Sequence, residues 1–157
     1  MSRTSPYTLL PKSVKGLLTG QYWSIPLRDG SFACGRVIQL PCGEAASSKT
    51  LFIAGLLDWH SGNEPTSECI ANRPCIAQGI AHIKTIKESG GLILGHRPLE
   101  FDDIEPWEVR GAMQHKGSHV FKGFEIVRAQ TPADDMLPMQ VVFGLLAIKS
   151  KAEHKFL

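Results

Sequence analysis

Residues 20–37, GQYWSIPLRDGSFACGRV, carry the strongest local structural signal in this chain. Within 21–28, aromatic and aliphatic residues of the types that favour β-strands predominate. Asp29 and Gly30 follow and predict a tight turn, because glycine accepts the positive φ of the turns that match strand twist. Residues 31–40 supply the partner strand. Side chains of a strand alternate between its two faces, and here apolar side chains occur on both faces. We therefore expect a β-hairpin that is covered in part on both faces.

Further along the chain, short apolar runs alternate with turn-forming stretches. Residues 50–57 are almost continuously apolar, which predicts a central, well-buried strand. Isoleucines recur at spacings of four, three and three within 75–88, after a proline and before a glycine pair, which predicts a helix. Residues 120–127 and 139–148 are two further strand candidates, each interrupted by a glycine that suggests a bend.

These elements predict an α+β fold, either a curved antiparallel sheet or a small partly closed barrel, with one main helix. The length of 157 residues favours one domain, which we place at residues 20–148. Residues 1–19 are expected to form a flexible entry segment from which leucines pack on the domain. Residues 149–157 are expected to form a polar C-terminal tail.

The composition is that of an ordinary globular domain, with 43% hydrophobic and 20% charged residues. It argues against disordered, coiled-coil and collagen-like proteins. The net charge of +2 is far below the excess that marks a nucleic-acid-binding protein. The apolar runs are shorter than the roughly 18 residues of a membrane-spanning helix, and no secretion signal is recognisable. We therefore expect a soluble, cytoplasmic protein with no membrane partner.

The chain lacks the common catalytic and metal-binding motifs, namely GxSxG, HExxH, GxxxxGK[ST] and a strand-to-helix GxGxxG. The cysteines are predicted to be free thiols rather than zinc ligands because none forms a CxxC pair: Cys34, Cys42, Cys69 and Cys75. His115 and His119 are four residues apart, but Gly117 argues against a helix, so we interpret them as loop histidines. We expect no enzyme, no metal and no cofactor. A thiol enzyme with Cys34 or Cys75 as nucleophile is the catalytic alternative.

An acidic segment stands out between residues 100 and 108, which hold five of the fifteen acidic residues and no Lys or Arg. With its two aromatic residues it has the composition of a surface that docks a basic protein partner. The candidate partner-binding residues are Glu100, Phe101, Asp102, Asp103, Glu105, Trp107 and Glu108. The plainer alternative is a solvated loop or helix start. A groove for nucleic acid is disfavoured because the nearby basic residues adjoin these acids.

Residues 20–37 also resemble the opening of immunity protein 26, a family of bacterial polymorphic-toxin immunity proteins. That opening has a glycine, an aromatic residue, an Ile-Pro-Leu-like triplet, a turn glycine, an aromatic residue and then Gly-Arg-Val. The matching residues here are Gly20, Tyr22 and Trp23, Ile25 to Leu27, Gly30, Phe32, and Gly35 to Val37.

The resemblance implies a non-catalytic α+β protein that binds and neutralises a cognate toxin from the same or a neighbouring bacterium. It transfers no toxin-contact residue. We interpret the matching hairpin residues as determinants of the fold, in which Asp29 and Gly30 make the turn and the packing comes from Trp23, Ile25, Leu27 and Phe32. The alternative to an immunity protein is a small barrel that binds RNA or a small ligand.

Overall fold

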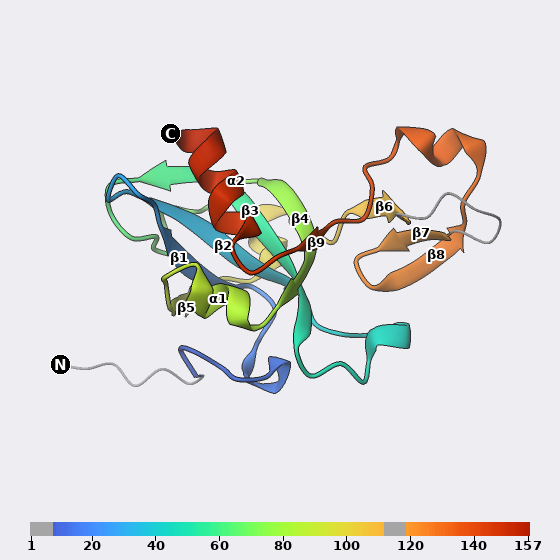
Figure 1. Ribbon diagram of the computed structural model, residues 1–157, viewed down its shortest axis with the longest axis horizontal. Coiled ribbons are helices and arrows are strands. Elements are labelled where there is room, and N and C mark those ends of the chain that lie inside the picture. The colour runs from blue at the N-terminus through green and yellow to red at the C-terminus, as the bar shows by residue number, and fades with distance from the viewer. Residues whose placement is uncertain (1–7, 112–118) are drawn as a thin grey trace.

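The computed structural model describes residues 8–111 and 119–157, which form an α+β fold with nine strands in two sheets (Figure 1). The larger sheet contains, in spatial order, β5 (Ile93–His96), β1 (Gln21–Pro26), β2 (Phe32–Gln39), β3 (Leu51–Ser61), β4 (Cys75–His82) and β9 (Val142–Phe143). The smaller sheet contains β6 (Glu108–Arg110), β7 (His119–Lys122) and β8 (Glu125–Ala129). The helices are α1 (Lys84–Glu88) and α2 (Ala147–Phe156), and the 3₁₀ helices are η1 (Val14–Gly16), η2 (Gly43–Ala45), η3 (Leu99–Asp102) and η4 (Pro132–Met136). The sheets are curved and are not closed into a barrel, which confirms the α+β prediction in its curved-sheet form.

The predicted hairpin is present as β1 and β2, which pair antiparallel with Trp23 opposite Gly35. Gly30 in its turn has a φ of 88°, so the glycine is used there for the positive φ that the turn requires. The Trp23 indole is fully buried, as expected for a core residue. A Cβ atom at Gly35 would collide with this indole. A glycine at this position therefore allows the Trp23 ring to pack directly against the backbone of β2.

Both faces of the larger sheet are covered, which explains why its strands show no polar face. One face packs on α1 and α2; its core includes Trp23, Ile25, Val37, Phe52, Leu56, Ile86, Phe143, Ile148 and Ala152. The other face packs on the loops around η3 and on the turn between β7 and β8; its core includes Tyr22, Ile38, Ile53, Leu57, Trp59, Ile70, Leu99, Ile104 and Phe124. The prediction that the hairpin is covered in part on both faces is confirmed.

The helix predicted for residues 75–88 is wrong over most of its length. Residues 75–82 form β4, which pairs antiparallel with β3, and the helix α1 has only five residues. As a strand, residues 75–82 form backbone hydrogen bonds with β3. The spacing of the isoleucines does not reveal this pairing, because it depends on residues elsewhere in the chain. A Cβ atom at Gly79 would crowd the carbonyl oxygen of Val141 and the ring of Phe143. The glycine therefore allows β4 and β9 to pack closely together.

The C-terminal residues also differ from expectation. The strand expected at 139–148 is reduced to the two residues of β9, and residues expected to form a polar tail form most of α2. Ile148 and Ala152 are fully buried, and the ring of Phe156 stacks on His60 with 5.1 Å between centroids. Apolar side chains spaced by four residues make this a core-packed helix. At the other end of the chain, Leu17 is buried as expected.

The fit of Gly35 beneath Trp23 can be tested by Gly35→Ala. The added methyl group must displace the indole or the strand, so we expect a loss of about 1–3 kcal/mol in the free energy of unfolding. Gly62→Ala is the matched control, since a Cβ atom there meets nothing within 4 Å. Urea unfolding measures both variants, and equal stability of the two would contradict the close-approach role of Gly35.

Candidate partner-binding site

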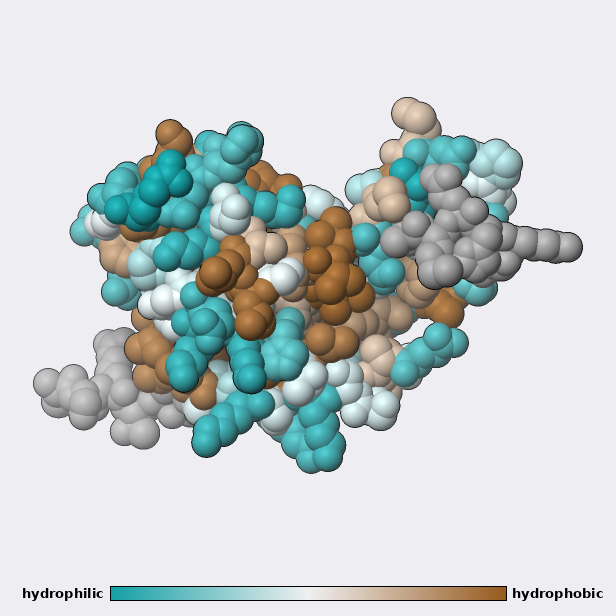
Figure 2. Space-filling view, in the orientation of Figure 1, coloured by the Kyte–Doolittle hydropathy of each residue, from teal (hydrophilic) through white to brown (hydrophobic). Residues whose placement is uncertain are grey.

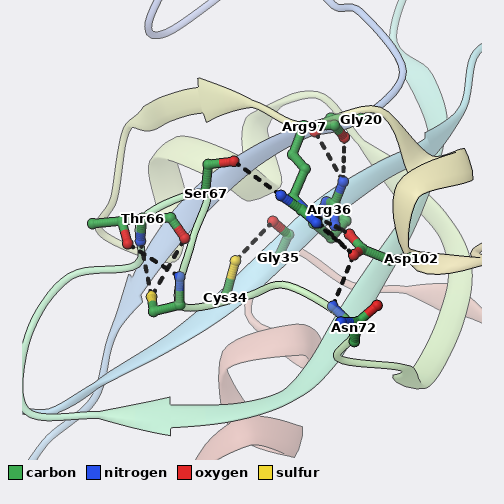
Figure 3. Close-up of polar contacts among 10 residues, drawn as sticks. Gly20, Cys34, Gly35, Arg36, Thr66, Ser67, Asn72, Arg97 and Asp102 are labelled. Atoms are coloured by element: carbon green, nitrogen blue, oxygen red, sulfur yellow. Dashed lines mark hydrogen bonds and ion pairs between the residues drawn. The ribbon is translucent and has the colours of Figure 1, made fainter.

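A buried arginine in the centre of the larger sheet organises the acidic segment (Figure 3). Arg36 extends from β2 and its side chain is completely enclosed. Its Nη1 donates a hydrogen bond to Asp102 Oδ2 at 3.3 Å. Its Nη2 donates to the backbone carbonyl oxygens of Gly20, at 3.2 Å, and of Arg97. One guanidinium thus connects the start of β1, the end of β5 and η3.

The carboxylate of Asp102 receives hydrogen bonds from two further directions. Arg97 donates from Nε to Oδ2 at 2.9 Å and from Nη2 to Oδ1 at 3.0 Å, and the backbone N–H of Asn72 donates to Oδ1 at 2.8 Å. Burial opposes ionisation of Asp102, but the hydrogen bonds from Arg97, Asn72 and Arg36 outweigh it, so its pKa lies below the usual range. Asp102 is therefore a buried anion paired with two arginines.

This geometry removes Asp102 from the set of carboxylates that a partner can reach. Its side chain has no exposed surface, whereas the sequence predicts Asp102 as a contact residue together with its neighbours. The reason is the fully buried Arg36, which requires a counter-charge within the same interior. Asp102 therefore positions the acidic segment and does not present it to a partner.

The remaining candidate side chains lie at the surface. Glu100, Asp103, Glu105 and Glu108 are exposed, Phe101 is 64% exposed, and Trp107 is half-buried. The guanidinium carbon of Arg97 lies 5.5 Å from the centre of the Phe101 ring, a distance typical of a cation–π contact. Glu105 is paired with Lys122 at 3.0 Å.

The surface around the acidic segment is hollowed on both sides. A groove of about 630 Å³ is lined by Gln39, Glu100, Asp103 and Glu105 among others. A second hollow, of about 290 Å³, includes Asp103, Glu105 and Trp107 in its lining. The carboxylates thus border concave surfaces into which side chains of a partner can fit.

Gln78 on β4 fixes the backbone of the segment between these hollows. Its Nε2 donates to the carbonyl oxygen of Glu105 at 3.0 Å, and its Oε1 accepts from the N–H of Trp107 at 2.9 Å. Neither Gln78 nor Arg36 was predicted to support the site. A charged residue amid the apolar residues of a strand was a usable signal for Arg36, whereas the sequence around Gln78 gives none.

The catalytic alternative finds no support in the cysteine environments. Burial raises the pKa of Cys34, and it raises the pKa of Cys75 to about 11, whereas a nucleophilic cysteine requires a lowered thiol pKa. All four cysteines are free thiols. Among the described residues, no three His, Cys, Asp or Glu side chains are grouped as metal ligands, and His115 lies outside the described ranges. In the described part of the chain, no helix combines the length and apolarity needed to span a bilayer.

Replacing Asp102 by Asn tests its role as a buried counter-charge. The variant leaves Arg36 enclosed with its anionic partner removed, so we expect a loss of about 3–5 kcal/mol in the free energy of unfolding. Asp103→Asn is the control at the adjacent, exposed position and is expected to change stability by about 0.5 kcal/mol or less. Denaturant titration compares the two, and similar values would contradict the buried-pair account.

Acidification provides a second test of the same pair. A carboxylate whose pKa is lowered by folding stabilises the folded state above its unfolded pKa, near 4, and loses that contribution as the pH falls through the folded value. We therefore expect the melting temperature of the unaltered chain to fall more steeply below about pH 4 than that of Asp102→Asn. Some decline remains in both, because hydrogen bonds from Ser31 and Arg128 also lower the pKa values of Asp29 and Asp134. Parallel curves would show that Asp102 contributes no acid sensitivity.

One of three comparisons with known proteins gave a match. Searches of curated proteins and of solved structures gave no match. The family model described as immunity protein 26 matches residues 19–113, more than half of the chain. The match includes Arg36, Arg97, Asp102 and the whole acidic segment, and it supports the family inferred from the hairpin. This chain belongs to the immunity protein 26 family.

Proposed function

We propose that this protein neutralises a cognate bacterial toxin by binding it, with no catalytic step of its own. The family to which the chain belongs points to a toxin as the kind of partner. The observation that carries the choice of surface is the contrast within the acidic segment. Asp102 is buried and anchors the segment, while the neighbouring carboxylates and Phe101 face outward.

The binding surface in this proposal, called the acidic surface below, consists of Glu100, Phe101, Asp103, Glu105, Trp107 and Glu108. Exposed carboxylates accelerate the encounter with a basic partner and determine its orientation. An exposed phenylalanine beside the hollows supplies an apolar anchor of the kind that dominates interface energies. We therefore expect the toxin to present lysine or arginine side chains around an apolar pocket.

The anchoring of the segment reduces the entropic cost of binding. Hydrogen bonds from Arg36, Arg97, Asn72 and Gln78 hold its backbone and its buried carboxylate before any partner arrives. A surface ordered in advance loses less conformational freedom on association than a mobile loop. The acidic surface can therefore bind a partner tightly even though its area is small.

The alternative of RNA binding is less well supported by the same geometry. The exposed carboxylates of this surface repel phosphate groups, and the two sheets are curved without forming the small barrel on which this alternative was based. We place the activity in the cytoplasm, where reducing conditions suit the four free cysteines.

Charge reversal on the acidic surface tests the proposal. The tagged protein is used to capture partners from its native cells, and we expect one near-stoichiometric protein that is toxic when produced without this chain. The double variant Glu100→Lys and Glu105→Lys is expected to lower the affinity for that protein by about 100-fold, because two attractive contacts become repulsive. Isothermal titration with the purified pair measures the change.

The matched control is Glu44→Lys with Glu64→Lys, which changes the net charge equally at exposed acids outside the acidic surface. It is expected to retain full affinity and to protect cells from the toxin. Equal affinity of both double variants would remove the acidic surface from the mechanism. Recovery of RNA in place of a toxic protein would contradict the immunity function itself.

A further inference from the structure

An exposed apolar ridge borders the acidic surface at the edge of the larger sheet. The ridge, called the apolar ridge below, consists of Pro138, Met139, Val141 and Val142, and Val142 is 72% exposed. Figure 2 shows hydrophobic atoms gathered in the middle of the view, where Figure 1 draws β9 between the two sheets. Contiguous apolar surface of this kind commonly marks an interaction site.

The apolar ridge connects the edges of the two sheets. Its first part lies beside β6, where the N–H of Arg110 donates to the carbonyl oxygen of Pro138 at 2.9 Å. Its last part lies beside β4, where the N–H of Ile80 donates to the carbonyl oxygen of Val141 at 2.8 Å. These hydrogen bonds hold the backbone of the ridge, so its exposed side chains are ordered before a partner arrives.

Val142 lies on the same face of the larger sheet as the acidic segment. It is opposite Ile80 in the parallel pairing of β9 with β4, and Ile80 packs against the core that includes Leu99 of η3. The next residue, Phe143, is buried in the core under α1 and α2. Because successive side chains of a strand project to opposite faces, Val142 points away from the two helices.

Two hollows connect the apolar ridge with the acidic surface, and Trp107 lines both of them. The first, of about 550 Å³, is lined by Pro138 of the ridge and by Glu105, Trp107 and Glu108 of the acidic surface, among others. The second lies between the two sheets, and its lining includes Trp107 and Val141. The ridge and the acidic surface are therefore parts of one continuous surface, with Trp107 at their junction.

The cations near this junction have partners of their own. Lys122 is paired with Glu105 at 3.0 Å, and Arg128 donates two hydrogen bonds to a carboxylate on η4. The Nε of Arg110 donates to a backbone carbonyl oxygen at 3.1 Å. In the described part of the chain, no cation lies within 4.0 Å of the exposed Glu108 carboxylate. Glu108 is therefore available to a basic side chain of a partner that covers the ridge.

We propose that the apolar ridge is the apolar centre of the toxin interface, and that the acidic surface is its charged border. The inference rests on the proposed function, since the toxin is the partner in both. The acidic surface has far fewer residues than the roughly 20–30 that each side of a standard interface uses, so the contact of a folded toxin extends beyond it. Interfaces combine an apolar core with a polar rim. We expect the toxin segment on the ridge to carry Leu, Ile, Val or Met next to Lys or Arg.

A toxin fits the apolar ridge better than a second copy of this chain or a lipid bilayer does. A symmetric dimer places the same patch of both copies face to face. Centred on the ridge, such a dimer brings the bordering Glu105 and Glu108 carboxylates of the two copies toward each other, which opposes association. The same carboxylates repel the anionic lipids of a bilayer. A partner with basic side chains beside an apolar patch avoids both repulsions.

Photo-crosslinking in the native cells tests the proposal. The photoreactive amino acid p-benzoylphenylalanine replaces Val142, Phe101 or Leu157 in three versions of the complete chain, and mass spectrometry identifies the molecule bound in each adduct. We expect position 142 to crosslink the same toxic protein as position 101, through a segment with aliphatic and basic residues. Leu157 is the control, because it is 45% exposed but follows α2, on the opposite face of the sheet. We expect no adduct with the toxic protein there.

Substitutions at the same positions give a quantitative test. Val142→Asp is expected to weaken binding of the crosslinked protein by about tenfold or more, because it places a carboxylate at the apolar centre of the interface. Val142→Leu keeps an aliphatic side chain, and Leu157→Asp is the matched charge control; both are expected to retain affinity. The exposure of Val142 predicts that Val142→Asp stays folded, which circular dichroism checks.

The outcomes separate this inference from the proposed function. A toxin adduct at position 101 without one at position 142, or equal affinity of Val142→Asp and Leu157→Asp, would overturn the inference alone. A second copy of the chain or a phospholipid in the adduct at position 142 would also overturn it, since another occupant would then cover the ridge. Absence of a toxic protein from the adducts at both positions would contradict the proposed function, and the inference with it.

Discussion

The ion pair between Arg36 and Asp102 is the constraint on which the arrangement of the molecule depends. A guanidinium in the centre of a sheet is tolerated only when its charge and most of its N–H groups are satisfied in the interior. Here one partner is Gly20 before β1, and the others, Arg97 after β5 and Asp102 in η3, lie more than 70 residues further along the chain. Satisfying one buried charge therefore fixes where the acidic segment leaves the sheet.

The two faces of the larger sheet are covered by elements of different charge. A sheet buried on both sides needs two sets of covering elements, and these elements determine the chemistry that each side shows to solvent. One side is covered by η3 and its flanking acidic residues, and the other by α1 and α2, which carry lysines. The acidic segment and the lysine-bearing helices thus lie over opposite faces of the sheet.

Local chemistry explains which features could be predicted from the sequence. The hairpin was predictable because Asp29 and Gly30 specify their turn without help from distant residues. The strand β4 was not, because its conformation depends on pairing with β3, and isoleucine spacing suggested a helix. The burial of Asp102 was hidden for the same reason, since its partner Arg36 is 66 residues away. Predictions failed where non-local contacts decide the outcome.

The sequence Gly35-Arg36 shows how two adjacent residues can serve both cores. Neighbouring residues in a strand project to opposite faces of a sheet. Gly35 leaves room for the Trp23 indole in the core under α1 and α2, while Arg36 reaches Asp102 on the side of η3. The pair thus couples the packing of one face to the placement of the acidic segment on the other. Under the proposed function, a substitution at Arg36 would weaken toxin binding without any contact to the toxin, because the proposed contact segment would lose its anchor.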